Sequence, residues 1–163
     1  MRCWIRHMFT PPWAVCRTFP KLALQAIEAA IRASETSHDG EICFAVEAHL
    51  TPRDLWRGLS PRQRAIEVFS NLRVWDTEHN SGVLIYLLLA DRDVEIVADR
   101  GIGARVPPTT WQAICRRMEH AFREGRFEEG VLCGIQEIGT LLAAHFPASQ
   151  ENPDELPNPP VIL

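Results

Sequence analysis

The residues best suited to chemistry lie in a short polar stretch between two apolar segments, and in a second polar stretch further along the chain. They are Asp76, Glu78, His79, Asn80, Asp99 and Arg100. Carboxylate and amide oxygens are the ligands that Ca²⁺ and Mg²⁺ prefer, whereas a single histidine does not make a zinc site. The oxygen-bearing members therefore predict a divalent-cation site made by Asp76, Glu78, Asn80 and Asp99. The remaining two, His79 and Arg100, are candidate contacts for an anion or a phosphate group.

A solvated polar loop beside Trp75 is the alternative interpretation of the first stretch. The choice depends on whether Asp99 returns to the loop that contains Asp76. The secondary structure between Asp76 and Asp99 determines whether they lie close together.

An apolar run from Val83 to Ala90 directly follows the first polar stretch. A membrane helix needs about 20 apolar residues, so this run fits a strand buried on both faces. Asp91-Arg92-Asp93 predicts a tight turn, and Val94 to Ala98 alternates as a half-buried strand does. The pattern predicts a β-hairpin whose second strand brings Asp99, Arg100 and Gly101 back beside residues 76–81.

The rest of the chain predicts helices and one further strand. Helical periodicity covers residues 18–37, the segment that begins at Ser60-Pro61, the segment after Pro107-Pro108, and residues 126–145. Residues 41–50 predict a strand that a helical crossover makes parallel to the central strand. We therefore expect an α/β fold, a small mixed β-sheet sandwiched by helices in the order α-β-α-β-β-α-α.

Two other acidic features have simple structural interpretations. Glu47 interrupts the apolar pattern of the first strand, and we expect it at a solvated edge position, with a site carboxylate as the alternative. The apolar run before Asp91-Arg92-Asp93 is similar to the strand of haloacid-dehalogenase-like phosphatases. That chemistry needs a lysine on the phosphate, and the only lysine is Lys21, so a hairpin turn is the better interpretation.

Composition limits the class of protein. A chain of 163 residues with 46% hydrophobic and 23% charged residues predicts one globular domain. A net charge of −4 makes nucleic acid a poor partner. Five cysteines without a CxxC pair favour reduced thiols in the cytoplasm, and Cys43, Cys115 and Cys133 are expected in the core.

The two ends differ from the domain between them. Residues 1–17 form a basic aromatic arm without an acid, which predicts peripheral contact with an anionic membrane or with a partner protein. An arm that packs its tryptophans on its own domain is the alternative. Residues 147–163 contain five prolines and three acids, which predicts a disordered acidic tail. The domain itself is expected over residues 18–146.

Several ordered motifs resemble the TPM domain family, named for a thylakoid lumen phosphatase, a photosystem II repair protein and an acetylcholine-receptor modulator. They are Asn80-Ser81-Gly82-Val83-Leu84, Ala90-Asp91-Arg92-Asp93-Val94-Glu95-Ile96, Gly101, and Phe122-Arg123-Glu124-Gly125-Arg126-Phe127. The resemblance covers roughly residues 19–146 and implies a fold of TPM type. It also points to the loop around Asn80, because some members look like divalent-cation binders.

The leading functional hypothesis is a binding or accessory module without catalysis. It would hold Ca²⁺ or Mg²⁺ weakly and act at a membrane or on an unidentified protein complex. The expected location is the cytoplasm, including the inner face of a membrane. The alternative is a metal-assisted acid phosphatase, a phosphomonoesterase, with Asp76, Glu78 and Asp99 around the ion and His79 or Arg100 on the phosphate.

Overall fold

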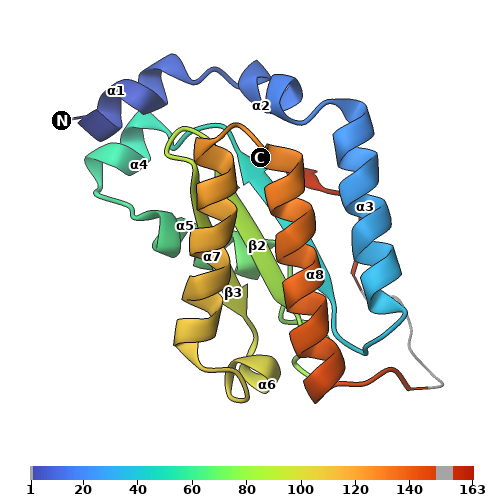
Figure 1. The fold of residues 1–163 in the computed structure, drawn as a ribbon. Helices are drawn as coiled ribbons and strands as arrows, with labels where there is room; N and C mark the ends of the chain where they lie inside the picture. The colour runs from blue at the N-terminus through green and yellow to red at the C-terminus, as the bar shows by residue number, and fades with distance from the viewer. Residues whose placement is uncertain (1, 150–155) are drawn as a thin grey trace.

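The computed structural model describes residues 2–149 and 156–163. Its strands form a mixed four-stranded sheet in the order β3-β2-β1-β4 (Figure 1). The elements are α1 (Arg2–Phe9), α2 (Trp13–Thr18), α3 (Lys21–Glu35), β1 (Ile42–Glu47), α4 (Pro52–Trp56), α5 (Pro61–Asn71), β2 (Val83–Leu88), β3 (Asp93–Ala98), α6 (Arg100–Gly103), α7 (Pro108–Arg123), α8 (Phe127–His145) and β4 (Val161–Ile162). The predicted helices and strands are all present. The short α1, α2, α4, α6 and β4 are additional.

Helices cover both faces of the sheet, which explains why β1 and β2 are buried along their whole length. One face packs Phe44, Val46 and Ile85 against α3, α7 and α8. The other face packs Ala45 and Tyr86 against α5. Alternate residues of one strand therefore enter two separate cores, so neither face tolerates a solvated side chain.

The predicted hairpin and crossover are both confirmed. β2 pairs antiparallel with β3, with Val83 opposite Ala98, and β1 pairs parallel with β2, with Ile42 opposite Val83. Ser60 and Gln63 form a capping box at the start of α5, within that crossover. The hairpin therefore fixes the position of Asp99, one residue beyond the end of β3.

Helices α7 and α8 lie side by side across the front of the sheet (Figure 1). Their close approach depends on small residues, because a side chain at Gly130 would meet the Phe122 ring. The predicted stripes of both helices face the core, including Ile114 on α7 and Ile135 on α8. The expected pair of covering helices is therefore confirmed.

The prediction of a disordered tail is wrong for its last residues. Val161 and Ile162 form β4, which pairs parallel with Ala45 and Val46 of β1, and Leu156 is buried. The physical reason is that β1 has a free edge, and an extended apolar segment satisfies its backbone groups. Residues 150–155 of the predicted tail lie outside the described residues.

Three other expectations are wrong, for different reasons. β1 lies between β2 and β4, so Glu47 is buried at 7% exposure instead of solvated at an edge. The helical pattern that begins at Ser60-Pro61 placed Trp75 on its buried stripe, but Trp75 is 47% exposed because α5 ends before it. Cys133 is exposed. Cys43 is buried as expected, and burial raises the pKa of its thiol to about 12.

The N-terminal arm forms two short helices across one end of the molecule (Figure 1). Val15 and Phe19 enter the core, whereas Trp13 is 62% exposed. The side chain of Trp4 lies outside the described part of the chain. Among the described residues, no helix combines the length and the apolar composition that crossing a bilayer requires.

Candidate functional site

The loop of residues 76–81 and the segment after β3 meet at the end of the molecule that carries α6, as the hairpin predicted. The backbone N–H of Asp99 donates to the carbonyl of Gly82 at 2.9 Å, and the N–H of Gly101 donates to the carbonyl of Asn80 at 2.9 Å. The Arg100 guanidinium also donates to Asn80 Oδ1 at 3.3 Å. Asn80, Asp99 and Arg100 are therefore held together, and we call these three residues the Asn80–Asp99 junction.

Two backbone features permit this contact. Asn80 has φ of 51°, a left-handed conformation that asparagine tolerates better than most residues do. Its carbonyl accepts hydrogen bonds from both Gly101 and Ile102. A side chain at Gly101 would collide with the carbonyl of His79, so the close approach requires glycine at that position.

Asp99 is the buried carboxylate of the junction, with 6% exposure. Its Oδ1 accepts a hydrogen bond from the N–H of Arg100 at 2.7 Å and caps the short helix α6. Among the residues that the structure describes, its Oδ2 has no hydrogen-bond partner. An ionised carboxylate oxygen that is buried without a partner costs free energy. This oxygen is the least satisfied polar atom of the junction.

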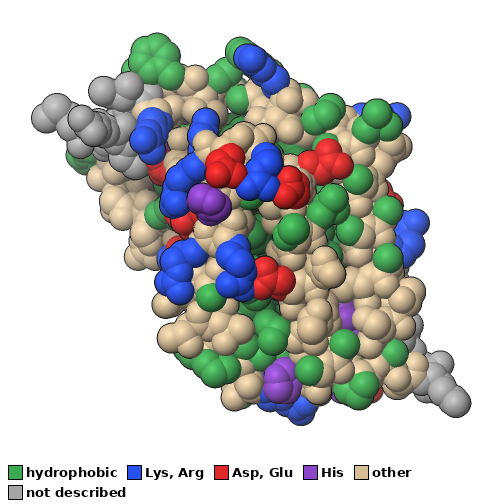
Figure 2. Space-filling model, in the orientation of Figure 1, with side chains coloured by type: hydrophobic (Ala, Val, Ile, Leu, Met, Phe, Trp, Pro, Cys, Tyr) green, Lys and Arg blue, Asp and Glu red, His purple; other side chains and the backbone are tan. Residues whose placement is uncertain are grey.

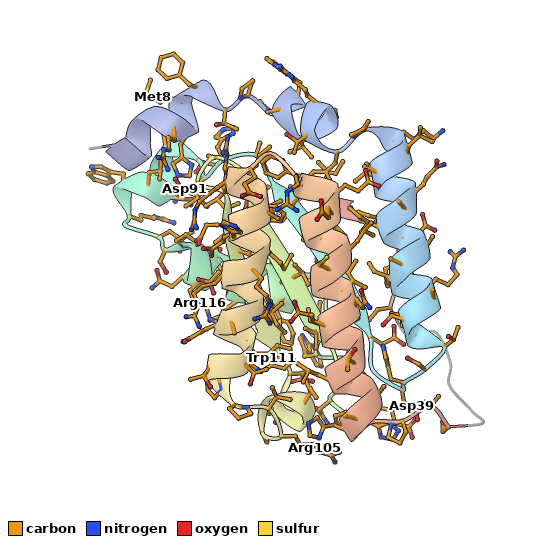
Figure 3. All side chains as sticks on the ribbon, viewed as in Figure 1. Met8, Asp39, Asp91, Arg105, Trp111 and Arg116 are labelled. Atoms are coloured by element: carbon orange, nitrogen blue, oxygen red, sulfur yellow. The ribbon has the colours of Figure 1, made fainter. Side chains whose placement is uncertain are left out.

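The remaining predicted site residues lie around the junction without contacting Asp99 through any hydrogen bond or ion pair that the described residues form. Asp76 and Glu78 are exposed on the loop. The His79 ring stacks on the Phe146 ring, with the two centroids 6.4 Å apart. The Arg105 guanidinium lies 4.3 Å from the centroid of the Phe146 ring. Figure 3 labels Arg105 and Asp39 at this end of the molecule. Within the described ranges, no three His, Cys, Asp or Glu side chains come together as a metal-binding group.

A second polar group, which the sequence reasoning did not assemble, surrounds Glu47. Its carboxylate accepts hydrogen bonds from Arg64 at 2.9 and 3.0 Å and from the Tyr86 hydroxyl at 2.6 Å. The hydrogen bonds to Glu47 raise the pKa of Arg64 above its ordinary value, and burial followed by the Glu47 contact raises the pKa of Tyr86. An acid alone in an apolar strand was the signal that such partners exist. The bidentate arginine makes this a structural ion pair.

A cleft between α7 and the edge strand β3 holds the third polar group. Asp93, Glu95 and Glu119 line it together with Trp111 and Arg116, the last two labelled on α7 in Figure 3. Burial is the main cause that raises the pKa of Asp93 to about 6, and the nearby Glu119 carboxylate adds to it. Sequence reasoning assigned Asp93 only to the hairpin turn, because Glu119 is distant along the chain.

Comparisons with known proteins agree with this architecture. A family model described as the TPM domain matches residues 17–141. The NMR structure of the BA42 protein from the psychrophilic bacterium Bizionia argentinensis is similar, with a TM-score of 0.76 and 32% sequence identity. The match covers 86% of this chain and 92% of that chain. Among curated proteins, none matches this chain.

Proposed function

Since the chain belongs to the TPM domain family, we propose that it is a binding or accessory module that holds a divalent cation at the Asn80–Asp99 junction. The single observation that supports this proposal is the buried Asp99 Oδ2 without a hydrogen-bond partner. A bound cation would offset the cost of that oxygen, and the Asn80 side-chain oxygen lies on the same junction.

The positions of the candidate oxygen ligands indicate that an ion would be held weakly. Asn80 and Asp99 are positioned, whereas Asp76 and Glu78 stand exposed on the same loop and would have to turn inward. Ordering those side chains opposes binding, and Arg100 would have to release Asn80 Oδ1. Ca²⁺ tolerates irregular oxygen ligands better than Mg²⁺ does, so we expect Ca²⁺ to bind more tightly.

The same geometry favours binding over catalysis. A carboxylate that serves as a nucleophile or a proton donor must reach its substrate. Asp99 Oδ2 is closed off from solvent, and Oδ1 is occupied by the Arg100 amide. A module of this kind acts through what it contacts, and we place it at the cytoplasmic face of a membrane or in a protein complex.

A cation titration followed by amide chemical shifts tests the proposal. Ca²⁺ or Mg²⁺ should move the backbone amides of Asn80, Arg100 and Gly101. Asp99→Asn should abolish these shifts, since asparagine keeps the helix cap but removes the charge. Glu128→Gln, which neutralises an exposed acid on α8, is the matched control and should respond as the wild type does. Identical shifts in the Asp99→Asn protein would overturn the proposed site.

The phosphomonoesterase alternative predicts a different result. A chromogenic phosphate ester should then be hydrolysed in the presence of Ca²⁺, Mg²⁺ or Mn²⁺, and turnover should vanish in the Asp76→Ala, Asp99→Ala double variant. Cation-dependent shifts without turnover at any pH favour the binding module.

A further inference from the structure

The most exposed large apolar side chains gather at the end of the molecule opposite the Asn80–Asp99 junction. They are Met8 at 77%, Phe9 at 80%, Trp13 at 62%, Leu22 at 78% and Trp56 at 83% exposure. They come from α1, α2, α3 and α4, which are spread along this end of the molecule (Figure 1). The other exposed large apolar side chains of the described residues are at most 47% exposed. An exposed apolar surface with side chains from four helices indicates a site that binds another molecule or a membrane.

Basic side chains predominate around this surface, although α4 also carries Asp54. Arg6, Arg17 and Lys21 are exposed beside the apolar side chains, and no acid occurs before Glu28. The whole chain has a net charge of −4, so this end is basic on an otherwise acidic protein. Figure 2 shows hydrophobic side chains at the upper edge of the molecule, over α1 and α2, with Lys or Arg side chains among them.

Contacts of a buried side chain on the inner side of α1 fix the orientation of this helix. His7 is 2% exposed, and its Nε2 lies 3.0 Å from Asp91 Oδ2 while its Nδ1 accepts the N–H of Leu50. Successive residues of a helix point about 100° apart, so anchoring His7 directs Met8 and Phe9 outward. Figure 3 shows Met8 on the outer side of α1 and Asp91 on its inner side. The apolar surface is therefore a built feature of the fold.

We infer that this end of the molecule docks on an anionic lipid bilayer, with Phe9, Trp13 and Trp56 entering the interface. Basic side chains next to exposed aromatic ones are the composition of interfacial helices that bind anionic lipid. A mostly apolar cleft between α1 and α4, lined by Met8, Pro12 and Leu55 among others, offers space for part of an acyl chain. The inference specifies the membrane part of the proposed function and is independent of the cation site.

Flotation of the full-length protein with vesicles, in the presence of a chelator, tests the inference. The protein should bind vesicles of phosphatidylcholine mixed with phosphatidylserine, bind pure phosphatidylcholine weakly, and release as salt is raised. Phe9→Ser and Trp56→Ser should each lower the partition coefficient by roughly tenfold, because each removes a large apolar side chain from the interface. Ile66→Ser, which changes an exposed apolar residue elsewhere, is the control and should leave binding unchanged.

Charge-reversal variants and a measurement of the oligomeric state distinguish a bilayer from a second copy of the chain as the occupant. The Arg17→Glu, Lys21→Glu protein should lose its preference for anionic vesicles, whereas Arg116→Glu on α7 should keep it. All three positions are exposed, so thermal unfolding should stay the same and report intact folding. Asp99→Asn should bind vesicles as the wild type does, which separates this inference from the cation site. Failure to bind either vesicle, or a dimer that Phe9→Ser dissociates, would refute the bilayer as occupant.

Discussion

The imidazole of His7 joins the N-terminal helix to the turn of the central hairpin, with Nε2 3.0 Å from Asp91 Oδ2. The backbone N–H of Leu50 donates to Nδ1 at 3.0 Å, so Nδ1 is an acceptor and Nε2 carries the proton. One buried ring thus connects three segments that are distant along the chain. This contact fixes α1, on which the proposed lipid surface depends.

Replacing His7 should detach α1 from the domain. His7→Ala leaves the Leu50 N–H without its acceptor and removes one partner of Asp91, so we expect a loss of about 2–4 kcal/mol in the free energy of unfolding. Chemical denaturation measures the loss, and limited proteolysis should cut first near residues 10–12. His120→Ala, on the exposed face of α7, is the matched control. Equal stability of the two variants would show that the buried contact is not formed.

The Glu47 group should behave as a buried ion pair. Glu47→Ala removes the acceptor of Tyr86 and the bidentate acceptor of Arg64, and we expect about 3–5 kcal/mol of destabilisation by urea unfolding. Glu67→Ala removes the exposed second acid that contacts the same Arg64, and should cost less than about 1 kcal/mol. Similar losses for both variants would contradict the assignment of Glu47 as the main partner.

Asp93 should make stability depend on pH in a defined direction. Its pKa is raised from the ordinary value of 3.8 to about 6 by burial and by the nearby Glu119, Glu95 and Asp91 carboxylates. The folded state therefore binds this proton more tightly than the unfolded state, and its contribution to stability is lost as pH rises from about 4 to 6.

The Asp93→Asn variant removes this dependence. It should melt on the order of 2–4 °C above the wild type at pH 7.5, and the difference should shrink toward pH 4. Differential scanning calorimetry across that range measures it, with Glu128→Gln as the control for loss of one negative charge. A variant that melts below the wild type at neutral pH would indicate that the Asp93 carboxylate is stabilised in the folded state.

The docked end of the tail should contribute to stability through Leu156. This side chain is 8% exposed and joins the core between the sheet and α5, so Leu156→Ala should cost about 2–3 kcal/mol. Leu163→Ala changes a side chain that is 43% exposed and should cost no more than about 0.5 kcal/mol. Guanidinium unfolding of both variants tests this, and equal midpoints would mean that the tail is not held as described.

Much of the fold could be predicted because local patterns determine it. The apolar run Val83–Ala90, the charged turn and the alternating strand gave the hairpin without knowledge of any partner. The helical stripes gave α3, α5, α7 and α8 for the same reason. The hairpin also placed Asp99 beside Asn80, since antiparallel pairing determines which ends meet.

What could not be predicted depends on the order of strands and on distant partners. Glu47 is buried against Arg64 and Tyr86, which lie far from it along the chain. The strand β4 has only two paired residues and so has no periodicity to detect. Arg64 and Tyr86 come from a helix and a strand that each fit an apolar pattern without Glu47. The orientation of Asp76 and Glu78 depends on loop backbone geometry, which residue types alone do not determine. The cation at the junction accordingly stays a prediction.

The backbone groups on the outer edge of β3 affect whether strands of different molecules pair at high concentration. The Arg62 guanidinium donates to the outward carbonyl of Ile96 at 2.5 Å, midway along this exposed border of the sheet. A carbonyl already bonded to a side chain cannot recruit a strand from a neighbouring molecule, and the arginine adds charge where such a neighbour would approach. Arg62 therefore hinders the strand pairing between molecules that begins a fibril.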